Sequence, residues 1–113
     1  MTTPRQNISM YEGETVAVRG TVVDDDGNAV DITAYTIKYV AEISPQLTKA
    51  TGDGITIDDG PAGLYSFTIE VADTIGGGSK QCTHECKVKD SSGNVYTIFT
   101  GNITIIATLI DTI

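Results

Sequence analysis

Hydrophobic and polar residues alternate along most of this chain. Val16 and Val18 are separated by a small residue, and a similar alternation runs through residues 37–43 and 65–71. A period of two is typical of strands that bury one face and leave the other in water. The pattern therefore predicts an all-β chain. The expected strands are 6–10, 15–23, 35–43, 54–57, 64–72, 81–89 and 94–109.

Clusters of glycine, aspartate and asparagine separate these runs. Residues 24–28 and 90–94 have the composition of tight turns, in which glycine supplies a positive φ and Asp or Asn bonds its own backbone. About seven short strands separated by such turns predict an antiparallel immunoglobulin-like β-sandwich. Residues 44–53 and 73–80 are expected to form mobile loops, and the one helical candidate is a single turn near 71–74.

The last predicted strand carries apolar residues on both faces, and a bend or bulge is expected in it at Gly101. Two interpretations are open: the strand is central and well covered, or residues 106–113 pack on a neighbouring subunit. In the second interpretation, the candidate interface residues are Ile106, Leu109, Ile110 and Ile113.

The length of 113 residues corresponds to a single domain over 1–113, with 1–6 and 106–113 as candidate extended tails. The formal net charge is −8, and only seven Lys and Arg residues are spread along the chain, which argues against nucleic acid as a partner. No apolar run approaches the roughly 20 residues of a membrane helix, so no membrane association is expected. Met1 precedes no apolar stretch, so no secretory signal is expected either.

Three potential metal ligands alternate within one predicted strand. Cys82, His84 and Cys86 share one face, where a rise of about 3.3 Å per residue separates the two sulfurs by roughly 13 Å. Zinc binds its ligands at about 2.3 Å, and a disulfide joins its sulfurs directly, so a regular strand supports neither. These side chains are therefore expected in the core; a tight turn in this segment would restore the metal hypothesis.

The acidic and glycine-rich turns match ion and phosphate sites in composition alone. Gly27 is fourth and Tyr35 twelfth when counted from Asp24, whereas an EF-hand has glycine sixth and glutamate twelfth. A hairpin turn closed by residues 26–28 is expected instead. Residues 76–80 lack the phosphate-loop spacing and precede a strand, not a helix. No metal or cofactor site is therefore expected.

The chain also lacks a grouping that would support catalysis. Its sole histidine, His84, is expected to point inward, and no Ser-His-Asp or Cys-His arrangement can be built on it. Paired carboxylates occur only in turns, where water keeps their pKa values ordinary. We therefore predict no enzymatic activity and no catalytic residues.

Several short motifs follow one another in a characteristic order. They are Gly13-Glu14-Thr15, Asp26-Gly27-Asn28-Ala29-Val30-Asp31-Ile32-Thr33-Ala34-Tyr35-Thr36-Ile37, Gly63-Leu64-Tyr65-Ser66-Phe67 and Asp90-Ser91-Ser92-Gly93-Asn94-Val95. In this order the chain resembles the immunoglobulin-like domains of tailed-phage structural proteins, especially the amino-terminal domain of baseplate upper proteins. The resemblance spans most of residues 8–105, and Ala34 stands where that family usually has glycine.

The resemblance implies a role in assembling a phage particle. The chain is expected to be a non-enzymatic structural protein of the virion, in a decoration, head-fibre or tail accessory role, assembled in the host cytoplasm. The expected partners are capsid or tail subunits, with the chain present as a homo-oligomer or in many copies on a lattice. The alternative is a carbohydrate or cell-surface binding module, for which Tyr11, Tyr35 and Tyr96 are the candidate contact residues.

Overall fold

The computed structural model describes residues 5–43 and 46–110, and strands dominate them. The elements are, in order, β1 (Ile8–Tyr11), β2 (Val16–Thr21), β3 (Thr36–Ala41), β4 (Leu47–Thr51), β5 (Gly54–Asp59), β6 (Leu64–Ile69), α1 (Val71–Thr74), β7 (Lys80–Lys89) and β8 (Val95–Ile106). The all-β prediction is confirmed, as is the single helical turn after β6.

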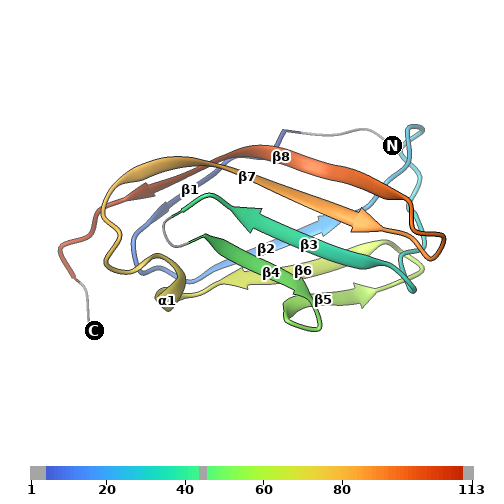
Figure 1. The fold of residues 1–113 in the computed structure, drawn as a ribbon, viewed down its shortest axis with the longest axis horizontal. Coiled ribbons are helices and arrows are strands. Elements are labelled where there is room, and N and C mark those ends of the chain that lie inside the picture. Colours follow the sequence, from blue (N-terminus) through green and yellow to red (C-terminus); the bar gives the residue numbers. More distant parts are fainter. Residues whose placement is uncertain (1–4, 44–45, 111–113) are drawn as a thin grey trace.

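The strands form one hydrogen-bonded sheet in the order β1-β8-β7-β3-β4-β5-β6-β2. Most neighbours are antiparallel, but β1 with β8 and β4 with β5 are parallel. The sheet curls until β2, β5 and β6 lie opposite β3, β7 and β8, which leaves β1 and β2 as its edges (Figure 1). The molecule measures 45 × 23 × 21 Å, and loops form its two ends.

Residues 47–51 form strand β4, so the prediction of a mobile loop over 44–53 is wrong for this part. The segment alternates poorly, because only Leu47 is buried and the residues after it are exposed or half-buried. Neighbouring strands make it a strand: β4 pairs with β3 on one side and with β5 on the other. The sheet is therefore mixed and eight-stranded, whereas the sequence predicted about seven antiparallel strands.

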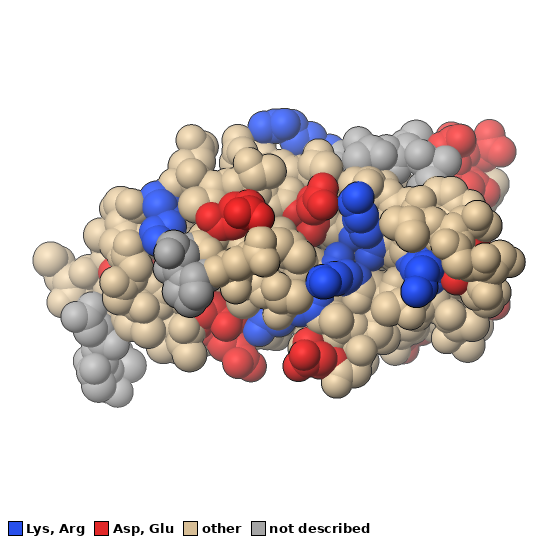
Figure 2. All heavy atoms as spheres, viewed as in Figure 1, with Lys and Arg blue, Asp and Glu red and all other residues tan. Residues whose placement is uncertain are grey.

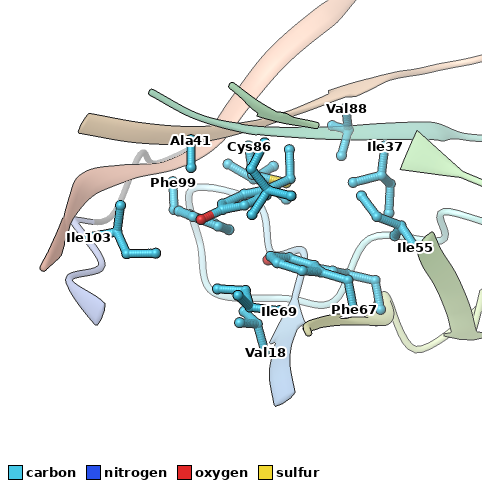
Figure 3. Close-up of a cluster of buried hydrophobic side chains, with 14 of the residues drawn as sticks. Val18, Ile37, Ala41, Ile55, Phe67, Ile69, Cys86, Val88, Phe99 and Ile103 are labelled. Carbon is cyan, nitrogen blue, oxygen red and sulfur yellow. The ribbon is translucent and has the colours of Figure 1, made fainter. Parts of the chain in front are cut away.

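Inward side chains of the curled sheet meet in one hydrophobic core (Figure 3). Tyr39, Phe67 and Val88, all predicted to face inward, are 0%, 3% and 1% exposed. The rings of Tyr39 and Phe67 lie 4.4 Å apart, although β3 and β6 are not neighbours in the sheet. Contacts of this kind hold the two layers together, and truncating a buried aromatic residue to alanine costs about 3–5 kcal/mol.

Strand β8 is bulged at Ile98, whereas the sequence predicts a bend or bulge at Gly101, which pairs regularly with His84. The register with β7 shifts after Cys86, so that Ile98 is the extra residue and both Ile98 and Phe99 are buried. Gly101 meets a different requirement, because a Cβ atom at this position would collide with the carbonyl group of Gln6. The absence of a side chain at Gly101 therefore lets Gln6 and Asn7, which we call the N-terminal segment, lie directly against β8.

Helix α1 ties several segments together at the end of the molecule where β8 ends (Figure 1). The Asp73 carboxylate accepts a hydrogen bond from the backbone N–H of Glu70 at 2.7 Å and pairs with Lys49 of β4 at 3.0 Å. The hydroxyl oxygen of buried Thr74 accepts a hydrogen bond from the backbone N–H of Gly13 at 2.8 Å. The turn after β1 is thus anchored on α1.

Candidate interaction surface at the end of β8

The candidate interface residues predicted at the C-terminus are strongly exposed. Ile106, the last residue of β8, is 39% exposed, Ile110 is 63% exposed, and Leu109 is as exposed as in an extended chain, at 103%. A single exposed apolar residue is common, but a group of them is typical of a contact surface. Ile113 lies outside the described residues.

Residues 107–110, which we call the C-terminal segment, are tied to the body of the protein. The backbone N–H of Ala107 donates to the hydroxyl oxygen of Ser79 at 2.8 Å, and that of Thr108 donates to Oε1 of Glu12 at 3.3 Å. The N–H of Ile110 donates to the Thr108 hydroxyl oxygen at 3.2 Å. The exposed apolar side chains therefore project from a backbone that the protein itself holds in place.

The carboxylate of Glu12 bonds the C-terminal segment and the glycine turn before β7, and the residue is only 7% exposed. Its Oε2 atom accepts a hydrogen bond from the N–H of Gly78 at 2.8 Å, and its own N–H donates to the carbonyl oxygen of Ile106 at 2.8 Å. Backbone donors from Gly78 and Thr108 stabilise the ionised carboxylate and lower the pKa of Glu12. One charged group thereby joins the turn after β1, the glycine turn before β7 and the C-terminal segment.

Tyr11 extends the exposed apolar surface onto β1. It pairs with Ile106 in the parallel β1–β8 ladder and is 54% exposed. We call Tyr11, Ile106, Leu109 and Ile110 the apolar end. The sequence predicts Tyr11 only as a candidate carbohydrate contact and predicts no role for Glu12. The pairing of β1 with β8 places both residues beside Ile106. That pairing joins strands far apart in the sequence, so a local pattern does not predict it.

The alternating Cys82, His84 and Cys86 lie on β7 as predicted. His84 and Cys86 are buried, Cys82 is half-buried, and both thiols are free. Burial raises the pKa of Cys86 to about 12, so its thiol stays protonated. Within residues 5–43 and 46–110, no three His, Cys, Asp or Glu side chains are placed to share a metal ion.

Both ring nitrogens of His84 have partners within the protein. Nε2 lies 2.6 Å from the carbonyl oxygen of Gln6, and Nδ1 lies 2.8 Å from the hydroxyl group of Tyr39. A carbonyl oxygen only accepts, so Nε2 carries the proton and Nδ1 accepts from Tyr39. Burial lowers the pKa of His84, and the hydrogen bond to Gln6 opposes this effect. His84 is therefore a neutral link between the N-terminal segment and the core.

The two remaining turn motifs serve the fold. Asp24 Oδ1 accepts hydrogen bonds from the N–H groups of Asp26 at 3.0 Å and Asn28 at 2.9 Å, and Gly27 has a φ of 85°. This is the predicted hairpin turn. The predicted loop over 73–80 contains the end of α1 and the glycine turn that Glu12 holds through Gly78.

Neither a protein-family model nor a curated protein matches this chain. No helix in the described part of the chain is long and apolar enough to span a bilayer. A functional proposal rests on the apolar end, whose exposed side chains project from a backbone held by Glu12 and Ser79.

Proposed function

We propose that this chain is a non-enzymatic structural protein of a phage virion, which binds neighbouring shell or tail subunits through the apolar end. The observation that carries the proposal is Leu109, which is fully exposed next to a backbone held by Glu12 and Ser79. Burying one such side chain in a contact contributes about 1.5–3 kcal/mol. A rigid group of exposed apolar residues is typical of a protein–protein contact.

We further infer that the curled sheet is an immunoglobulin-like sandwich. In this assignment β5, β6 and β2 take the places of strands D, E and B, while β8, β7 and β3 take those of G, F and C. The parallel contact between β4 and β5 involves only two residue pairs and joins the two layers. Together with the order of the sequence motifs, this strand order supports the resemblance to phage structural domains.

The resemblance supports a place on the virion as a decoration, head-fibre or tail accessory protein, present in several copies. The proposed partners are capsid or tail subunits. Because the chain has a net charge of −8, a basic patch on those subunits would favour docking.

Co-purification with phage particles tests the proposal. The wild-type chain should remain with particles through density-gradient purification, and a variant with both Leu109→Asp and Ile110→Asp should be lost from them. Val95→Asp is the matched control, because Val95 is 56% exposed but lies at the start of β8, at the opposite end of the strand. Absence of the wild-type chain from particles, or equal retention of all variants, would refute the proposal.

A carbohydrate-binding role is the second candidate, and a different region supports it. Thr36 pairs with Lys89 of β7, and Val88 of β7 pairs with Tyr96 of β8, so Tyr35 and Tyr96 lie at the same end of the sheet. Burial raises the pKa of Tyr35. Tyr96 is 38% exposed. Aromatic rings beside a few polar groups are typical of small-molecule sites. A glycan array probed with the wild type and with Tyr96→Ala tests this role, and no signal from the wild type would eliminate it.

A further inference from the structure

A pocket opens beside α1, at the same end of the molecule as the apolar end. Its volume is ≈ 160 Å³, and Ile43, Leu47, Ile75 and Ile105 supply its apolar walls, with Lys80 among the other lining residues. A cavity of about 150 Å³ holds a benzene-sized apolar group. The pocket is therefore the right size for one leucine or isoleucine side chain.

We propose that this pocket binds Leu109 of a second copy of the chain, and that the exchange is reciprocal. The proposal rests on the proposed function and names one of the neighbours that the apolar end contacts. Because the pocket and the C-terminal segment share one end of the molecule, two copies related by a twofold axis can each insert Leu109 into the other. Such an interface is closed and stops at two copies.

Leu109 does not fill the pocket of its own chain. The hydrogen bonds from Ala107 to Ser79 and from Thr108 to Glu12 hold the backbone immediately before it. With an exposed fraction of 103%, the Leu109 side chain is not covered by its own protein. The side chain and the pocket that fits it are thus both available to a second molecule.

The charge distribution favours a contact between two copies at this end. The chain carries a net charge of −8, but neither the C-terminal segment nor β8, which leads to it, contains a charged residue. In Figure 2, most charged side chains visible on this face lie over its middle and right-hand part.

Sedimentation equilibrium over a range of protein concentrations tests the proposal. The wild type should dimerise reversibly. Leu109→Asp removes the apolar ligand, and Ala72→Phe blocks the pocket from the exposed side of α1, so each should weaken dimerisation by about tenfold or more. Val95→Asp should dimerise like the wild type. Circular dichroism of each variant checks that the fold is retained.

A mixture of the two variants identifies the mode of contact. The Leu109→Asp chain keeps an open pocket and the Ala72→Phe chain keeps its Leu109, so a mixed pair retains one of its two contacts. The mixture should therefore dimerise more strongly than either variant alone. A strictly monomeric wild type, or weakening by Leu109→Asp but not by Ala72→Phe, would overturn the pocket assignment. If the wild type is monomeric and particle binding still depends on the apolar end, the proposed function stands without this inference.

Discussion

Glu12 at one end of the molecule and the turn aspartates at the other act over very different distances along the sequence. At the end formed by the turns at 24–34, 59–63 and 90–94, which we call the hairpin end, aspartates bond backbone N–H groups two to four residues further along the chain. These residues are Asp24, Asp31, Asp59 and Asp90. At the apolar end, Glu12 bonds Gly78 and Thr108, which are 66 and 96 positions away.

The difference in contact range separates two structural roles. Each aspartate at the hairpin end closes its own turn through its side chain, and backbone bonds such as that from Ile32 N–H to the Gly60 carbonyl oxygen join the turns at 24–34 and 59–63. Glu12 instead joins three segments that meet only in the folded chain, and it fixes the backbone that presents Leu109. The loss of Glu12 should therefore affect the whole apolar end, whereas the loss of one turn aspartate such as Asp90 should affect its own turn.

The largest effect is expected from Glu12→Ala, compared with Asp90→Ala as the matched loss of a carboxylate. Glu12→Ala leaves the N–H groups of Gly78 and Thr108 without their acceptor, so the whole apolar end should loosen. Urea unfolding should give a clearly larger fall in midpoint than for Asp90→Ala. Hydrogen exchange at Gly78 and Thr108 should approach that of an unstructured peptide, while exchange in the 90–94 turn stays slow.

Acid provides an independent check on Glu12. Its pKa is lowered in the folded chain, so its contribution to stability is complete above the ordinary value of 4.5 and is lost as the pH falls through the folded-state pKa. Glu12→Gln should remove this part of the acid sensitivity and keep the side chain's size. Equal urea midpoints for Glu12→Ala and Asp90→Ala would break the comparison between the two ends.

The contrast in contact range also explains what the sequence pattern could predict. Period-two alternation located seven of the eight strands, and the composition around Gly27 predicted a hairpin turn that the structure contains, because both signals lie within a few residues. Strand β4 was missed because its pairing partners, not its own alternation, define it. The bulge was assigned to Gly101 instead of Ile98, because glycine is a local signal and register against β7 is not.

The sequence likewise predicts only the local part of the candidate site. The apolar run at the C-terminus indicated Ile106, Leu109 and Ile110 from sequence alone, and all three are exposed. Glu12 and the pocket beside α1 have no sequence signal, and the sequence indicates Tyr11 only as a carbohydrate contact. Each depends on segments far apart in the chain, which come together only through the parallel pairing of β1 with β8 and the placement of α1.

The next largest effect is expected from Tyr39→Phe, which tests a long-range polar link in the middle of the molecule. The substitution removes the hydroxyl donor to Nδ1 of His84 and leaves a buried nitrogen without a partner. Such a loss costs about 1–3 kcal/mol in free energy of unfolding. The control Tyr96→Phe, at an exposed hydroxyl of the hairpin end, should change stability by about 0.5 kcal/mol or less. If Tyr39→Phe and Tyr96→Phe lowered the free energy of unfolding equally in denaturant titrations, the buried bond from Tyr39 to His84 would contribute no more than an exposed hydroxyl.

A smaller effect is expected from pH, through the same histidine. Burial lowers the pKa of His84 below 6.5 in the folded chain, so between that folded-state pKa and 6.5 the unfolded chain binds more protons. The free energy of unfolding should therefore be unaffected above this window, fall as the pH drops through it, and level off below it. Urea midpoints measured between about pH 8 and about pH 5 check this, because the chain has a single histidine. A midpoint that rises on acidification in this range would show that the folded chain prefers protonated His84.

The smallest effect is expected from Gly27→Ala at the hairpin end. Gly27 has a φ of 85°, which disfavours any residue with a Cβ atom, but a Cβ there would meet no atom within 4 Å. The cost should therefore be about 1 kcal/mol, arising from the backbone alone. Because the turn closes on its own residues, neither dimerisation nor hydrogen exchange at Thr108 should change. A Gly27→Ala variant that weakens the dimer would mean that the hairpin end communicates with the apolar end, and that the two ends are not independent.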